Sequence, residues 1–189
     1  MSIVSLQKIA SHFSGIAELL TRVDLHAIEA VARAIRETQA AQRTVFTFGN
    51  GGSAATALHF ANNLLSPKHG ARTRVNCLMS NVSVISALAN DIGYELIYSE
   101  QLRMLASPGD LAIAISVSGN SPNCVHGLQC AREMGLVTAA LVGFDGGRLR
   151  SLSDYAILVP CELYPLVEDI HLVIAHAIAS AMVSDADHA

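Results

Sequence analysis

The alternation of two kinds of segment constrains the fold of this chain more than any other feature. Five short runs of β-branched and other apolar residues are separated by segments with helical periodicity. These runs span residues 44–49, 73–79, 111–117, 137–143 and 155–159. Strands that alternate with helices form βαβ units and pair as a parallel sheet. Because the runs are continuously apolar, we expect helices to cover both faces of this sheet.

Helical patterns fill the rest of the chain and predict one domain of 189 residues. We expect two N-terminal helices within residues 1–42, the second capped by Asp24, and a polar tail at 185–189 that frays. The sheet and its flanking helices then occupy residues 43–184. The helices between and after the strands are expected at residues 54–65, 83–105 with a break near Gly93, 122–134 and 166–182.

Composition excludes several classes of protein. Apolar residues make up 51% of the chain and charged residues only 15%, whereas disordered chains are poor in apolar and rich in charged residues. The net charge of −4 and the lack of a basic block argue against binding to nucleic acid or to a membrane surface. So few charges on a small domain favour an oligomer that buries part of its surface between subunits.

The cysteines and the N-terminal sequence indicate a cytoplasmic protein. The first 14 residues contain Lys8 and polar residues but no apolar core of a signal peptide, and no apolar run is long enough to span a bilayer. None of the cysteines shows CxxC spacing, which suits buried thiols in a reducing compartment. The cysteines are Cys77, Cys124, Cys130 and Cys161.

The loop after the first expected strand is rich in glycine. It reads Gly-Asn-Gly-Gly-Ser-Ala at residues 49–54 and leads directly into a helix. Glycines let backbone N–H groups approach a ligand, and a helix N-terminus favours an anion. The loop fits the dinucleotide pattern GxGxxA, but no Asp or Glu follows between residues 51 and 90 to hold a ribose. The Walker pattern is also absent, so the loop suits a phosphate or sugar phosphate, unless it is only a tight turn.

A second loop, after the third expected strand, is rich in serine. Ser116, Ser118 and Ser121 place hydroxyl groups at the start of another helix, where Pro122 favours Ser121 as the N-cap. Hydroxyls and free N–H groups hold a phosphate without a lysine. Parallel α/β sheets bind ligands at the carboxyl ends of their strands, so we expect the two loops to form one anion site.

Three motifs together resemble the sugar isomerase (SIS) domain family, in the branch that holds phosphoheptose isomerases and the DnaA initiator-associating protein. They are Gly-Asn-Gly-Gly-Ser-Ala at 49–54, Ile-Ser-Val-Ser-Gly-Asn-Ser at 115–121 and Asp-Gly-Gly at 145–147. The likeness covers nearly the whole chain. It implies a three-layer α/β sandwich with a five-stranded parallel sheet of flavodoxin-like order. It also implies a homotetramer that is built on the N-terminal helices, with sites between subunits.

The resemblance implies an aldose–ketose isomerase that converts sedoheptulose 7-phosphate to a heptose 7-phosphate. The serines of both loops would hold the phosphate, and Asn50 and Asp91 would contact the sugar. Val117 departs from the family, in which a threonine is usual. The expected substrate-binding residues are Asn50, Gly51, Gly52, Ser53, Asn90, Asp91, Ser116, Ser118, Asn120 and Ser121.

The family's catalytic positions are less regular here. The family has a histidine, a glutamate four residues later, a glutamine and a second histidine, and some members bind zinc with this set. An amide replaces the glutamate that acts as the base, and a carboxylate replaces the glutamine. The four positions hold His59, Asn63, Glu168 and His176.

Glu168 and His176 are therefore the expected catalytic residues. They are eight residues apart on one helix and share a face, as do His59 and Asn63 at spacing i, i+4. If the two helices meet, His59, Glu168 and His176 form a His₂Glu set that would hold zinc and polarise a carbonyl. Glu168 cannot be both a ligand and the sole base, so these two roles compete.

Two functions remain open. The first is an isomerase of sugar phosphates. The second is a binding module without catalysis, such as a DnaA-associating regulator or a phosphosugar sensor. Asn63 favours the second function, because an amide cannot take a proton from carbon. Glu168 and His176 favour the first, because a pure binding module has no need of that pair.

Overall fold

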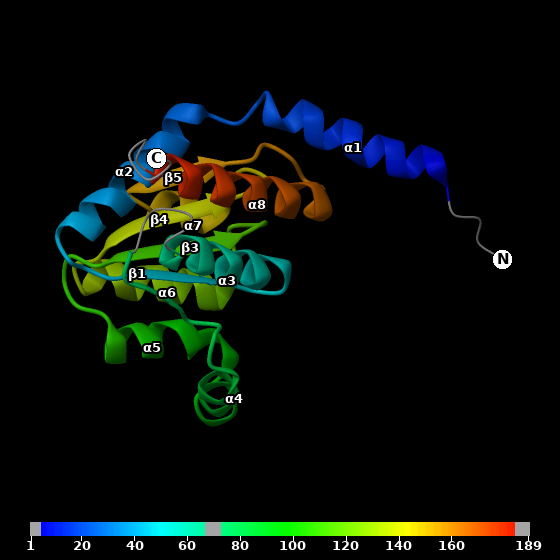
Figure 1. The fold of residues 1–189 in the computed structure, drawn as a ribbon. Helices are drawn as coiled ribbons and strands as arrows, with labels where there is room; N and C mark the ends of the chain where they lie inside the picture. Colours follow the sequence, from blue (N-terminus) through cyan, green and yellow to red (C-terminus); the bar gives the residue numbers. More distant parts are fainter. Residues whose placement is uncertain (1–4, 67–72, 184–189) are drawn as a thin grey trace.

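The computed structural model describes residues 5–66 and 73–183 and shows three layers, helix–sheet–helix (Figure 1). The tail expected at residues 185–189 lies outside the described residues. In chain order the elements are α1 (Leu6–Leu20), α2 (Leu25–Ala40), β1 (Val45–Gly49), α3 (Gly52–Leu65), β2 (Val75–Cys77), α4 (Val82–Asp91), the 3₁₀ helix η2 (Tyr94–Leu96), α5 (Ile97–Leu105), β3 (Leu111–Ser116), α6 (Pro122–Glu133), β4 (Val137–Val142), α7 (Gly147–Leu152), β5 (Tyr155–Leu158) and α8 (Tyr164–Ala181).

All five strands pair in parallel in the order β2-β1-β3-β4-β5, which confirms the predicted fold class and strand order. The chain moves outward from β1 to β2 on one side and from β3 to β5 on the other. The order of the strands reverses between β1 and β3, and α/β sheets bind their ligands at such a point. Gly49 lies opposite Ile115 in the register, so the loops after β1 and β3 leave the sheet side by side.

Side chains that alternate along each strand separate two hydrophobic cores. In β3, Ile113 and Ile115 pack with α1, α2, α3 and α8, whereas Ala112 and Ala114 pack with α5, α6 and α7. Every residue of β3 is buried. Burial of an isoleucine side chain contributes about 1.5–3 kcal/mol, so both faces stabilise the central strand. The sheet is covered on both sides, as the continuous apolar runs predict.

The structure differs from the sequence prediction in two elements, β2 and α7. β2 is confined to Val75–Cys77, inside the predicted 73–79, because it is an edge strand with β1 as its one partner. The helix predicted at 83–105 breaks near Gly93 as expected, into α4 and α5. The short helix α7 was not predicted, because its six residues are too few to show a helical period.

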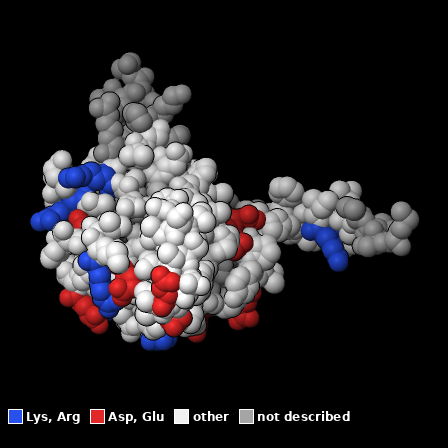
Figure 2. Space-filling view, turned by 90° about the horizontal axis from the view of Figure 1, so that it is seen from below, with Lys and Arg blue, Asp and Glu red and all other residues white. Residues whose placement is uncertain are grey.

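Helix α1 projects from the body of the molecule (Figure 1) and packs in part against α8. Several of its apolar side chains are exposed, including Leu6 at 79% and Phe13 at 67%. Figure 2 shows this arm with almost no charge and the body with charges of both signs intermixed between wide uncharged areas. Among residues 5–66 and 73–183, no helix combines the length and apolarity needed to cross a membrane.

Candidate active site

The glycine-rich loop joins β1 to α3 through very few residues. β1 ends at Gly49, Gly51 takes the N-cap position and α3 begins at Gly52. None of the described side chains caps this helix, so N–H groups of its first turn remain free for a ligand. Ser53, in the same turn, is only 4% exposed. The loop thus presents backbone donors and one hydroxyl at a helix end that favours anions.

The serine loop begins α6 in a similar way. Ser121 is the N-cap and Pro122 the first helical residue, as expected. The Ser121 hydroxyl does not cap the helix; it lies 3.3 Å from Ser116 Oγ, so it occupies no N–H group of α6. Gly119 has φ +65°, and a Cβ there would collide with the Gly146 carbonyl. This turn therefore requires glycine.

The two loops line one cavity of about 110 Å³. None of the described lining residues is a lysine or arginine. Hydroxyls, N–H groups and two helix N-termini therefore provide its positive potential. The lining residues are Asn50, Ser53, Ser116, Val117, Ser118, Ser121, Tyr164 and Glu168.

Glu168 brings a carboxylate to this cavity from α8. Its side chain lies so close to Gly52 that a Cβ at position 52 would collide with the carboxylate. Position 52 must therefore be glycine for Glu168 to keep its place. A carboxylate would repel a phosphate bound beside it, so phosphate binding alone gives Glu168 no function.

Three of the side chains predicted to bind the substrate lie outside the lining of the cavity. Asn90 and Asp91 end α4, where Asn90 Nδ2 donates to Asp91 Oδ1 at 2.8 Å. Asn120 holds the serine loop against the first turn of α7. Its Nδ2 donates to the Ser118 carbonyl at 3.0 Å, and its Oδ1 accepts from the Arg148 N–H at 3.0 Å.

His59 and His176 meet where α3 packs against α8. Their Nε2 atoms are 2.8 Å apart, the rings are edge to face, and both side chains are exposed. The two helices run in parallel, so Gly52 faces Glu168 at one level and His59 faces His176 about two turns further on. Glu168 and His176 are thus about 12 Å apart along the axis of α8.

The expected His₂Glu metal set is therefore not assembled within one protomer. Residues 5–66 and 73–183 contain no group of three or more His, Cys, Asp and Glu side chains that could hold a metal ion. Asn63, at the position of the family's glutamate, is 3% exposed, and its Nδ2 has no hydrogen-bond partner among these residues. Catalytic zinc takes three protein ligands, so two imidazoles do not fit it. Glu168 lies on the same face of α8 as His176 but about two turns closer to the start of the helix.

Sequence reasoning missed four polar side chains near the cavity. Asn123, Tyr94 and Tyr98 contact the amide of Asn50, and Tyr164 lines the cavity itself. Asn123 directly follows the serine loop, and that position was a usable signal. The tyrosines come from other helices, and no local pattern connects them with the loops.

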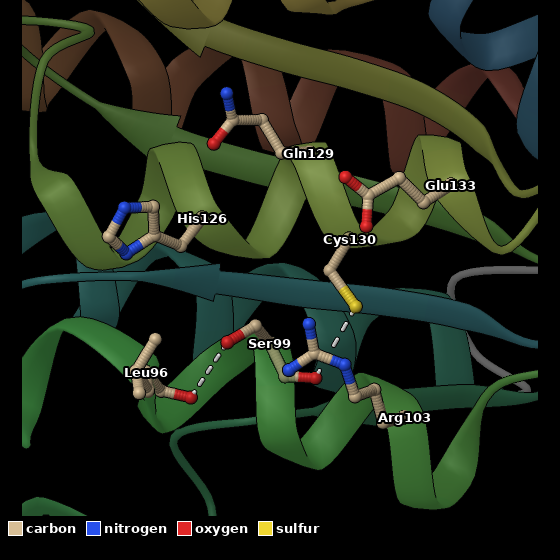
Figure 3. Close-up of a pocket in the computed structure, with 7 residues that line it drawn as sticks. All are labelled: Leu96, Ser99, Arg103, His126, Gln129, Cys130 and Glu133. Carbon is tan, nitrogen blue, oxygen red and sulfur yellow. Dashed lines mark hydrogen bonds between the residues drawn. The ribbon is translucent and has the colours of Figure 1, made fainter. Parts of the chain in front are cut away.

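A second hollow lies on the opposite face of the sheet, between α5 and α6 (Figure 3). Several of its polar groups already have partners within the protein. Ser99 Oγ donates to the Leu96 carbonyl at 3.0 Å, and Cys130 Sγ lies 3.5 Å from the Ser99 carbonyl (Figure 3). Arg103 pairs with Glu100. None of the predicted site residues lines this hollow, so the cavity at the strand ends is the candidate site.

Known proteins resemble this chain over most of its length. The model of the SIS domain family matches residues 11–143. The phosphoheptose isomerase of Paramagnetospirillum magneticum is 37% identical over 174 residues, which cover 91% of this chain and 90% of that protein. The phosphoheptose isomerase of Akkermansia muciniphila is 36% identical over 172 residues, which cover 90% of this chain and 88% of that protein.

Solved structures give the same result. The phosphoheptose isomerase from Neisseria gonorrhoeae has a TM-score of 0.89 at 27% identity, over 94% of this chain and 98% of that one. The phosphoheptose isomerase from Francisella tularensis has a TM-score of 0.88 at 26% identity, over 95% of this chain and 98% of that one. The chain belongs to the SIS domain family, in its phosphoheptose isomerase branch.

Proposed function

We propose that this protein is an isomerase that interconverts the ketose and aldose forms of a sugar phosphate, with sedoheptulose 7-phosphate as its substrate. The observation that carries the proposal is the shared cavity. The two loops, which suit a phosphate, and Glu168, which suits proton transfer, line the same space. The relatives named phosphoheptose isomerase support this choice of substrate.

The phosphate binds between the two loops. It accepts hydrogen bonds from serine hydroxyls and from free N–H groups at the start of α3, and it faces the N-terminus of α6. Hydrogen bonds to a charged group contribute about 1.5–3 kcal/mol each, so several of them replace a cationic side chain. Val117 contributes backbone but no hydroxyl. The hydroxyls belong to Ser53, Ser116, Ser118 and Ser121.

Glu168 is the general base of the proposed reaction. Starting from the ketose, its carboxylate removes a proton from C1 while the carbonyl oxygen on C2 gains a proton, which gives an enediol. The protonated Glu168 then returns its proton to C2, and the hydroxyl on C1 loses its proton to leave the aldehyde. The amide of Asn63 cannot perform either transfer.

His176, paired with His59, is the second proton-transferring group. An imidazole ring can accept a proton on one nitrogen and donate one from the other, so this pair suits the transfer between the two substrate oxygens. Glu168 and His176 lie on one face of α8, about 12 Å apart along its axis. In the proposed complex the reacting carbons lie between these two levels. An extended seven-carbon chain is long enough to run from the phosphate loops to this point.

No step in this scheme passes through a metal. The resemblance implies zinc, but the histidine pair supplies only two ligands, and the carboxylate lies at the level of the loops. Of the two competing roles of Glu168, the geometry supports the base and not the ligand.

We further propose a cytoplasmic homotetramer. The apolar side chains exposed on α1 and the absence of buried residues in α4 support contacts between copies, because exposed apolar patches mark interaction surfaces. The four cysteines form no disulfide, which agrees with a reducing compartment.

The test is incubation of the purified protein with sedoheptulose 7-phosphate, followed by chromatography of the product. We expect an aldose phosphate from the wild type and almost none from Glu168→Gln. A wild type that binds ketose phosphates from pentose to heptose but converts none of them would overturn the proposal. It would favour the non-catalytic alternative, a phosphosugar-binding or DnaA-associating regulator.

A further inference from the structure

The amide of Asn50, in the glycine-rich loop, is enclosed by three other side chains. Its Oδ1 accepts from Asn123 Nδ2 at 2.8 Å and from the Tyr94 hydroxyl at 3.0 Å, and the Tyr98 hydroxyl lies 3.1 Å away. Its Nδ2 donates to Asn123 Oδ1 at 2.8 Å. The enclosing residues come from α6, η2 and α5, so three separate elements converge on one loop residue.

A backbone group fixes the direction of both amides. The Cys124 N–H, which can only donate, donates to Asn123 Oδ1 at 2.9 Å. The oxygen of Asn123 is thereby identified, and its nitrogen must face Asn50 Oδ1. Asn50 must in turn direct its nitrogen at the oxygen of Asn123. Because Asn123 is 1% exposed, water does not compete for these bonds.

Tyr98 supports the backbone of the same loop. It is fully buried, and its hydroxyl donates to the Gly49 carbonyl. Burial raises the pKa of Tyr98, so the phenol keeps its proton at neutral pH. One hydroxyl hydrogen serves one acceptor at a time. Tyr94, which is 49% exposed, is therefore the tyrosine that donates to Asn50 Oδ1.

We infer that Asn123 and Tyr94 are positioning residues that make Asn50 a hydrogen-bond donor to the substrate. Both donors occupy the oxygen of Asn50, whereas only one of its two N–H groups has a partner among the described residues. Asn50 lines the cavity, so the other N–H is available there to a carbonyl or enediolate oxygen. A fixed donor stabilises the negative charge that develops on this oxygen. The inference rests on the proposed isomerase function.

The test compares Asn123→Ala and Tyr94→Phe with a control, Tyr155→Phe. Tyr155 lies on β5 beside Val137 at the start of β4, at the opposite end of the sheet from the loops. Three quantities are measured for each protein: kcat and KM with sedoheptulose 7-phosphate, the inhibition constant of inorganic phosphate, and the midpoint of thermal unfolding. Tyr94→Phe removes one oxygen from a half-exposed side chain, so it tests the inference even if Asn123→Ala unfolds.

We expect kcat to fall about ten-fold in Asn123→Ala and about three-fold in Tyr94→Phe, as lost hydrogen bonds predict. Inhibition by phosphate should change by less than about two-fold, because both variants keep the serine hydroxyls and every backbone N–H group of the two loops. Tyr155→Phe should match the wild type. An active protein whose kcat is unchanged in both variants, or whose phosphate binding weakens in parallel with kcat, would overturn the inference and leave the isomerase proposal standing. A wild type that neither binds nor converts the sugar phosphate would overturn both.

Discussion

The loops after β1 and β3 and the helical face of α3 and α8 form two halves of the candidate site, and they are constructed differently. In the loops, residues that act together are close in sequence, such as Ser116 and Ser121, whose hydroxyls are 3.3 Å apart. On the helical face, the partners come from distant parts of the chain. His59 and His176 are 117 residues apart and meet because α3 packs in parallel with α8.

The comparison distinguishes a site whose geometry follows from a local sequence motif from a site whose geometry depends on the packing of two helices. A glycine- or serine-rich loop at the end of a strand determines its own backbone and therefore its ligand class. A set of side chains on two helices depends also on how far one helix is shifted along the other. Because of the way α3 is shifted along α8, Glu168 lies beside the glycine-rich loop, and His59 and His176 contact each other without the carboxylate.

The largest effect is expected from Glu168→Gln, which keeps the shape of the side chain and removes its charge. Loss of a general base lowers rates by about 10²–10⁴-fold, and phosphosugar affinity should change little because the phosphate sits on other residues. Turnover and calorimetric titration check the two parts. Asp169→Asn is the matched control, because Asp169 bonds to His12 at 2.7 Å and lies outside the cavity lining. An equal loss in both variants would show that the base is misassigned.

The sequence predicted the fold and the loops well for a physical reason. Strand ends, glycines and N-caps act within a few residues, so Gly49, Gly52 and Ser121 were interpretable without tertiary information. The apolar character of β3 also indicated burial on both faces, and the structure confirms it.

The sequence could not predict the neighbourhood of Glu168 or the enclosure of Asn50. Helical periodicity gives the face on which Glu168 lies but not the level on a neighbouring helix that it meets. Tyr94 and Tyr98 reach Asn50 only because α5 and η2 fold back over the loop, more than 40 residues later in the chain. For the same reason, metal ligation by His59, Glu168 and His176 stays a prediction: the described residues of one protomer do not bring the three side chains together.

Gly52→Ala is the next largest expected effect and tests the contact between the two halves. A Cβ at position 52 would collide with the Glu168 carboxylate, so the base must move. A small displacement of a reacting group can lower the rate by about 10²-fold. Alanine in a helix is otherwise up to about 1 kcal/mol more favourable than glycine, so the fold should survive. A variant with normal turnover and an unchanged melting temperature would refute the close contact.

Acid should destabilise the protein through His171, a fully buried residue of α8. Burial lowers the pKa of His171 from 6.5 to about 4 in the folded protein. The stability that this histidine contributes is complete above pH 6.5 and is lost as the pH falls toward 4, because the unfolded chain takes up the proton first. The loss is roughly 3 kcal/mol.

Urea unfolding at several pH values between 7.5 and 4 measures this loss. His171→Leu, which cannot titrate, should show a smaller decrease in the free energy of unfolding over the same range. If the variant and the wild type lose stability equally, carboxylates elsewhere cause the acid sensitivity.

Ser121→Ala should have a moderate effect that is confined to the loops. The change removes one hydroxyl donor to the phosphate and should weaken phosphosugar binding by about 1–3 kcal/mol in calorimetry. Ser151→Ala is the control, because Ser151 lies exposed on α7 and bonds to the Arg148 carbonyl. If Ser121→Ala binds the phosphosugar as tightly as the wild type does, other residues hold the phosphate.

The smallest effects are expected from two separate experiments: the substitution Asn63→Ala, and removal of metals from the wild type. Asn63 occupies the family's base position, but its amide cannot accept a proton from carbon, and its side chain is buried on the packed face of α3. Turnover per folded molecule should therefore change by less than about three-fold, the size of one modest hydrogen bond. Dialysis of the wild type against a chelator should have no larger effect, because two imidazoles do not complete a catalytic zinc shell. If Asn63→Ala lowers turnover more than Glu168→Gln does, or if zinc restores activity lost on dialysis, the reaction takes place at the helical face of α3 and α8. The loops then only bind the phosphate.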